Sequence, residues 1–228
     1  GASRLNSKRT YLTFSGKAMK EKVSFLVTTD FSAPIPLLDA YIAYHLSDRF
    51  TASVGQRRNF TNTRELTFEE YNLQFINRGN STTLFNNSGR EFGLFLEGKI
   101  GTNSVLVPQA SITSGDGANS FGINSTDYDY GGFKYGGRLD WYVFGMFKQG
   151  NQGFAADLGR EKSLKMVIGG SGSINQGASN DKGEGHGQFL FYNKDKDIQL
   201  PEQRKIHADI LVKYRGFSLL GEYVNVTA

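Results

Sequence analysis

A period-two alternation of apolar and polar residues recurs along most of the chain and constrains the fold more than any other feature. Between residues 133 and 147 every second position is apolar or small: Phe133, Tyr135, Gly137, Leu139, Trp141, Val143, Gly145 and Phe147. Residues 206–214 alternate in the same way, with Leu211 as the single apolar residue on the polar side. Because side chains of a strand point alternately to its two faces, the pattern predicts an all-β chain.

The alternation predicts ten strands, at residues 9–17, 23–31, 37–46, 51–60, 91–100, 105–115, 133–147, 164–175, 205–215 and 217–227. Most of them approach the ~9–11 residues with which a tilted strand crosses a bilayer, and no segment resembles the ~18 apolar residues of a spanning helix. The predicted lipid-facing sets include Val23/Phe25/Val27, Leu38/Ala40/Ile42/Tyr44, Phe92/Leu94/Leu96 and Leu164/Met166/Ile168.

The lengths of the connections support a membrane barrel. Three connections are tight turns, at residues 47–50, 101–104 and 215–216, whereas residues 61–90, 116–132 and 176–204 are long and rich in Gly, Asn and Asp. Ten antiparallel strands place the short turns at one end and the long loops at the other, which is typical of transmembrane β-barrels. The link at 148–163 is too long for the short-turn end.

Ten strands are too few to enclose an aqueous channel, which appears at roughly 16–18 strands. The chain also stops at Val224–Ala228 without an aromatic closing strand, which would leave an open edge in lipid. We therefore expect residues 1–228 to be a single outer-membrane barrel domain, incomplete at its C-terminal end, with the completeness of its N-terminal end left open.

Composition excludes several other classes of protein. The chain has no cysteine, and its net charge of +4 is dispersed, so we expect neither a disulfide framework nor a nucleic-acid surface. His45, His186 and His207 lie far apart, and no catalytic motif occurs, so we expect no catalytic residues, cofactor or metal. A Ca²⁺ site is an alternative for four loop residues without calcium-loop spacing: Asp116, Asn119, Asp127 and Asp129.

Several short motifs, in order and spacing, are similar to the phosphate-selective porin O/P family. They begin at Gly55-Gln56 and continue as Arg64-Glu65-Leu66-Thr67-Phe68, Phe75-Ile76-Asn77-Arg78 and Gly89-Arg90-Glu91-Phe92-Gly93. Residues 137–142 and 209–223 extend the resemblance, which covers about residues 9 to 225. Phe68 and Asn77 stand where the family usually has Ser and Glu.

The resemblance implies a transmembrane antiparallel β-barrel of 16 strands when complete, of which about ten are present here. It also implies a Gram-negative outer-membrane location, contact with lipid and lipopolysaccharide, and commonly a homotrimer. Anions would pass through a lumen that an infolded loop narrows.

Segment 61–90 is the candidate constriction because its apolar residues can pack on the inner wall while its charges line the aperture. The predicted constriction residues are Arg57, Arg64, Glu65, Glu69, Glu70, Arg78 and Arg90. Arginines that share a lumen would favour anions. The alternatives are an extracellular cap, or arginines that pair with Glu69, Glu70 or Glu91 and only fix the segment.

Charged residues that alternate along the strands predict the pore wall: Lys165, Arg138, Asp140, Asp209, Lys213 and Arg215. Their alternating signs favour cross-strand ladders. The function we expect is a passive porin for small solutes, moderately selective for anions such as phosphate. The alternatives are a docking subunit that binds other envelope proteins, and a soluble secreted β-sandwich that binds carbohydrate.

Overall fold

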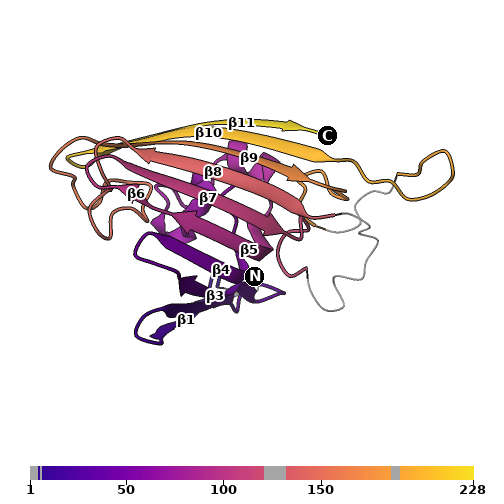
Figure 1. Ribbon diagram of the computed structural model, residues 1–228, viewed down its shortest axis with the longest axis horizontal. Coiled ribbons are helices and arrows are strands. Elements are labelled where there is room, and N and C mark those ends of the chain that lie inside the picture. Colours follow the sequence, from indigo (N-terminus) through magenta and orange to yellow (C-terminus); the bar gives the residue numbers. More distant parts are fainter. Residues whose placement is uncertain (1–4, 6, 121–131, 186–190) are drawn as a thin grey trace.

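The computed structural model describes residue 5 and residues 7–120, 132–185 and 191–228. They form one antiparallel sheet of eleven strands in sequence order, in which β6 lies off the main path and pairs with β7 (Figure 1). The strands are β1 (Tyr11–Ala18), β2 (Val23–Asp30), β3 (Leu37–His45), β4 (Phe50–Arg58), β5 (Arg90–Gly98), β6 (Ile100–Gly101), β7 (Val105–Thr113), β8 (Lys134–Tyr142), β9 (Lys165–Asn175), β10 (Gln203–Tyr214) and β11 (Phe217–Thr227). The predicted all-β antiparallel architecture is confirmed.

All ten predicted strands are present, and among the described residues the two-residue β6 is the one strand that the alternation did not predict. The largest difference is at residues 133–147, where β8 ends at Tyr142. The strand was predicted to continue to Phe147, but Phe147 is buried and packs edge-on against Tyr142, with ring centroids 5.7 Å apart. The prediction was wrong there because the alternation continues by composition into a connection that turns inward.

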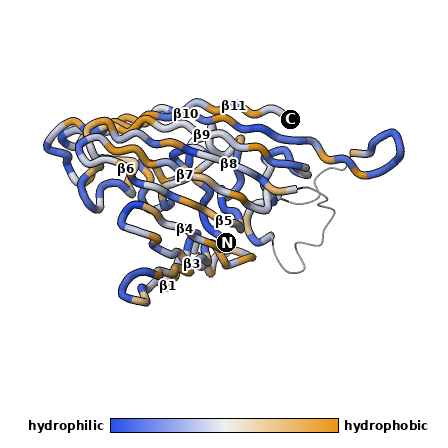
Figure 2. Tube along the Cα trace, viewed as in Figure 1, coloured by the Kyte–Doolittle hydropathy of each residue, from blue (hydrophilic) through white to orange (hydrophobic). Residues whose placement is uncertain are grey.

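The two faces of the sheet differ in polarity, and polar and apolar residues alternate along the same strands (Figure 2). On the outer face Ile42, Leu94 and Ile206 are exposed by 55%, 58% and 58%. The other face carries buried charged side chains, among them Asp39, Glu91, Lys134, Arg138, Asp140, Lys205, Asp209 and Lys213. The predicted division of the strands into two faces is therefore present.

The connection between β4 and β5, residues 59–89, folds back onto the charged face, and we call it the infolded segment. It contains α1 (Arg64–Thr67), η1 (Glu70–Asn72) and α2 (Asn80–Phe85). The backbone N–H of Glu65 donates to Glu222 on β11 at 2.9 Å, and the Tyr11 hydroxyl on β1 donates to Glu70 at 3.4 Å. Five residues of chain span at most ~18 Å, so both edge strands contact one short stretch, and the sheet curls around it.

A small apolar core lies where the infolded segment and the connection 143–164 pack on the sheet. Its buried members are Phe68, Phe147, Ala155, Val167 and Leu211. Leu211, the single apolar residue on the polar side of its strand, therefore lies where that face is covered by the infolded segment.

The short turns and the long loops lie at opposite ends of the strands, as the antiparallel order requires. The long connection 143–164 is the exception at the short-turn end. It is held to the turn between β10 and β11, because its Asp157 accepts a hydrogen bond from the N–H of Gly216 at 2.7 Å. No helix in the described part of the chain is long and apolar enough to cross a membrane.

Two paired glycines, Gly55 on β4 and Gly93 on β5, allow their strands to approach the neighbours closely. A Cβ at Gly93 would lie 2.3 Å from the carbonyl oxygen of Ile112, and one at Gly55 would lie 2.3 Å from that of Ala40. Gly55 also has φ +127°, which side chains of L residues rarely adopt.

The sheet is curled but not closed. Within the described residues, no pairing joins β1 to β11, so both remain edge strands. Of the predicted barrel, the described residues show an antiparallel, two-faced sheet.

Candidate functional site

Two arginines and two aspartates hold the infolded segment to the middle of the sheet, and we call them the central clamp. Arg64 of α1 donates from Nη2 to Asp140 on β8 at 2.7 Å and from Nε to Asp209 on β10. Arg138 donates from Nε to Asp140 at 2.8 Å and from Nη2 to Asp209. All four side chains are nearly fully buried. The sequence predicts Arg64 as a constriction residue and the other three as wall residues, and the structure brings all four into one cluster.

The central clamp carries no net charge. Burial lowers the pKa of Arg64, but Asp140 and Asp209 outweigh it and raise that pKa above its ordinary value. Each ion loses several kcal/mol of hydration on burial, and only close pairing offsets that loss. The clamp therefore stabilises the position of α1 and offers little positive potential to a passing anion.

A second group of charges ties the segment to itself and to β4. Arg58 donates to Glu69 and Glu70, both at 2.9 Å, and Arg78 donates to Glu70 at 3.0 Å. Both arginines also bond the carbonyl oxygen of Phe68, at 2.7 and 2.8 Å. Burial raises the pKa of Glu70, but the charges of Arg58 and Arg78 outweigh it and lower the pKa to about 2.

The C-terminal end of the infolded segment is anchored to the connection between β9 and β10. Glu184 accepts hydrogen bonds from the N–H groups of Ser88 and Gly89 at 2.9 and 2.8 Å. Its other carboxylate oxygen has no partner among the described residues, and burial raises its pKa. Lys205 of β10 donates to the carbonyl oxygen of Phe85 at 2.7 Å.

For Arg78 the geometry favours the alternative in which the arginines pair with carboxylates and fix the segment, because Arg78 pairs with Glu70. For Arg90 that alternative was wrong about the partner. Arg90 pairs with Asp39 at 3.0 Å, so its ion pair joins β5 to β3 and does not hold the infolded segment.

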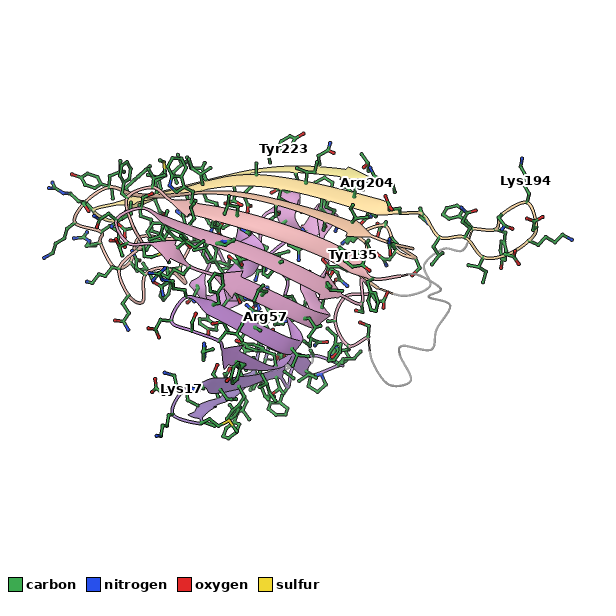
Figure 3. The ribbon with its side chains drawn as sticks, viewed as in Figure 1. Lys17, Arg57, Tyr135, Lys194, Arg204 and Tyr223 are labelled. Carbon is green, nitrogen blue, oxygen red and sulfur yellow. The ribbon has the colours of Figure 1, made fainter. Side chains whose placement is uncertain are left out.

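A cavity of about 330 Å³ lies between the infolded segment and the sheet, and four arginines line it: Arg57, Arg58, Arg64 and Arg138. Figure 3 shows Arg57 near the middle of the sheet, whereas Lys17 and Lys194 lie at the margins of the molecule. Arg57 pairs with Glu97 at 2.6 Å. Its guanidinium carbon lies 5.1 Å from the ring centre of Tyr41 and 5.2 Å from that of Phe95. This cavity is the candidate functional site.

The remaining predicted wall residues hold connections in place. Lys213 is fully buried and donates to the carbonyl oxygen of Asn151 at 2.6 Å, and Lys165 donates to that of Phe144 at 2.5 Å. Arg215 does not lie on the wall, because β10 ends before it. It occupies the turn that follows, with its guanidinium 5.1 Å from the Tyr214 ring.

Three residues of the site region were missed as site residues by the sequence analysis. Arg58 received no role in the sequence analysis; in a regular strand it would face away from its neighbour Arg57, yet both line the cavity. The alternation of burial breaks at Gly55, and its left-handed φ is the local reason. Glu97 lies outside the motifs, and Glu222 lies in the stretch 209–223 that extends the resemblance but received no role there. Glu222 accepts a hydrogen bond from the Glu65 N–H, and the Glu65 carboxylate accepts one from the Gly79 N–H at 2.9 Å.

Within the described residues, no group of three or more His, Asp and Glu side chains is placed to hold a metal ion. Asp127 and Asp129 of the alternative Ca²⁺ site lie outside the described residues. Comparison with family models, with curated proteins and with solved structures finds no match to this chain.

Proposed function

We propose that this chain is part of the wall of a Gram-negative outer-membrane β-barrel, which holds a water-filled channel open for small solutes. The observation that carries the proposal is the inverted polarity of the sheet, with apolar side chains exposed and charged side chains buried. A sheet with one face in water packs its apolar face on a core. In a membrane barrel the apolar face meets lipid and the polar face lines the lumen.

The exposed apolar side chains form a band across all ten long strands. Its members include Phe14, Val27, Ile42, Val54, Leu94, Ile112, Leu139, Ile168, Ile206 and Leu219, one from each strand. Ten strands spaced by roughly 4.8 Å make a band about 45 Å wide. The largest apolar patch of a typical soluble monomer covers roughly 300–600 Å². A band about 45 Å wide exceeds that area once it is more than about 13 Å tall, and Phe92, Leu94 and Leu96 alone span ~14 Å along β5. The size of the band therefore supports contact with lipid over contact with water.

Closure of the barrel is part of the proposal. Both edge strands reach the infolded segment, at Glu65 and Glu70, and this curl of the sheet supports the proposal. An open edge is not stable in lipid, and further strands would have to pair with β1 and β11. The family resemblance of the sequence gives sixteen strands in all and a homotrimer, with lipopolysaccharide as a neighbour, and we include these in the proposal.

A docking subunit of a larger envelope complex is the second candidate. The infolded segment occupies the concave face, which favours a plugged lumen over an open one. A hairpin around the Tyr192–Ile198 bridge also projects beyond the ends of the strands, where Lys194 is labelled (Figure 3). Such a projection suits contact with another envelope protein.

Conductance distinguishes the two candidates. The full-length protein, refolded in detergent and added to a planar bilayer in KCl, should give stepwise increases in current. A matched control is the same preparation after heat denaturation, which should give none. Repeated reconstitution with correctly folded protein and no current steps would exclude the channel and leave the docking subunit.

The anion preference expected from the sequence stays a prediction. Each of the arginines Arg57, Arg58, Arg64, Arg78 and Arg90 is paired with a carboxylate, so their combined field is small. The reversal potential in a KCl gradient measures the preference. Arg57→Gln, Arg64→Gln and Arg78→Gln should shift it toward cations if these arginines set the preference.

A further inference from the structure

We propose that the cavity beside Arg57 binds an uncharged, polyhydroxylated solute such as a sugar, in preference to a phosphate-type anion. The inference deepens the proposed function and rests on it, because it names the class of solute that the channel would hold. It follows from the pairing of the charges, the aromatic side chains and the access of the site to water.

The charges of the cavity are matched. Arg57 pairs with Glu97, Arg58 with Glu69 and Glu70, and both clamp arginines with Asp140 and Asp209. The wall of the cavity has four arginines and two carboxylates, Glu97 and Asp140. The other paired carboxylates, Glu69, Glu70 and Asp209, do not line it but bond the same arginines. An anion that enters therefore meets arginines whose charge is already offset by bonded carboxylates, so their combined field is small.

An anion would also have to displace a carboxylate that is already bonded. The clamp aspartates and arginines are nearly fully buried, and separating such a pair leaves a charge without a partner in a site of low dielectric. The carboxylates would repel the phosphate as well. Both effects oppose phosphate binding at this place.

A polyhydroxylated solute needs no such displacement. Each hydroxyl both donates and accepts a hydrogen bond, while a guanidinium has five N–H groups and a carboxylate about four acceptor sites. Paired arginines and carboxylates therefore retain hydrogen-bonding capacity at their outer atoms. Gln109, Gln152 and Thr67 add neutral donors and acceptors to the same lining.

Aromatic side chains offer a surface for the apolar face of a sugar ring. Phe60, Phe68 and Tyr142 line the cavity together with the charged groups. The volume of about 330 Å³ lies at the low end of ligand sites, roughly 300–1,000 Å³, and suits a small solute.

Among the charged groups that line the cavity, the Arg57–Glu97 pair is the most accessible to water. Their side chains are exposed by 21% and 32%, whereas the central clamp is nearly fully buried. Solute would therefore contact this pair first. Glu97 is the position at which the charge balance can be changed without disturbing the clamp.

The test compares D-glucose and inorganic phosphate on the folded full-length protein, by equilibrium dialysis and by block of channel current. The unchanged protein should bind glucose saturably and more tightly than phosphate. Glu97→Gln leaves Arg57 without a carboxylate, so it should weaken glucose binding about tenfold or more and strengthen phosphate binding. Glu202→Gln, which removes a carboxylate from the exposed pair with Arg204, should change neither.

Tighter binding of phosphate than of glucose by the unchanged protein would overturn the inference, as would binding of neither solute. Equal glucose binding by the Glu97→Gln and Glu202→Gln proteins would overturn the assignment to this cavity. Failure of the proposed porin function gives a different result from failure of this inference, because equilibrium dialysis measures solute binding without requiring a channel. A protein that binds glucose but never conducts would refute the porin and keep the site.

Discussion

Replacing Arg64 by methionine tests whether the central clamp holds the infolded segment. Methionine fills a similar space but has no charge, so Arg138 alone would face both aspartates. The side chains of Asp140 and Asp209 are exposed by only 8% and 1%. Arg138 bonds both of them, so two buried carboxylates would share one arginine and one negative charge would be uncompensated.

The expected magnitude follows from the burial of these charges. Breaking a buried ion pair by removing one partner costs about 3–5 kcal/mol. The sheet does not have to unfold to avoid this cost, because release of α1 lets water reach the carboxylates. At ~1.4 kcal/mol per factor of ten, a loss of 3 kcal/mol raises the population of released segment roughly 100-fold.

Hydrogen exchange measured by mass spectrometry reports this release. Peptides that cover α1 should exchange faster in Arg64→Met, while peptides from β9 and β10 should keep their protection. Arg204→Met is the matched control, because Arg204 is 65% exposed in its ion pair, and such a surface pair contributes about 0–1 kcal/mol.

A charge-balanced double variant sharpens the test. Arg64→Met with Asp140→Asn leaves Arg138 with one carboxylate, so the double variant should be less perturbed than the sum of the single variants. Unchanged exchange of α1 in Arg64→Met would refute the role of the clamp. Additive effects in the double variant would refute the charge argument.

Three further predictions concern other anchors. Glu70→Gln should flatten the pH dependence of hydrogen-exchange protection in the infolded segment. The Glu70 pKa is lowered from 4.5 to about 2, so its charge stabilises the folded state above pH 4.5, and this stabilisation is lost as the pH falls toward 2. An unchanged exchange profile over that range would contradict the prediction. Glu184→Gln should be tolerated because an amide oxygen accepts the same backbone bonds without a buried charge, whereas Glu184→Ala should lower the free energy of unfolding by about 1–3 kcal/mol; urea titrations that coincide would contradict it. Gly93→Ala should cost about 1–3 kcal/mol through overpacking, while Gly137→Ala, whose Cβ would meet its nearest atom at 3.6 Å, should change little; equal unfolding temperatures would refute this contrast.

The strands were predictable because their signal is local. Period-two alternation is a property of each strand by itself, and the lengths of connections order the strands in an antiparallel sheet. The alternation is strong in β10, where Ile206 and Tyr214 face outward and Lys213 faces inward. The prediction was wrong at Phe147 because composition alternates there without a partner strand.

The candidate site was predictable only in part, because its members are far apart in the sequence. Arg64 and Asp209 were both expected near the lumen, but nothing in the chain indicated that residues 145 apart would form one ion pair. Arg58 was missed because the alternation of burial breaks at one glycine. Glu97 was missed because its partner depends on how β4 and β5 align.

The amino-acid sequence by itself determined a two-faced antiparallel sheet and the placement of most charged residues on one face of it. It did so because side-chain direction in a strand depends only on position parity. Only the tertiary structure decided what those charges do. Whether an arginine attracts an anion or holds a loop depends on the carboxylate within reach, and that distance is set by strand register and by the path of the infolded segment.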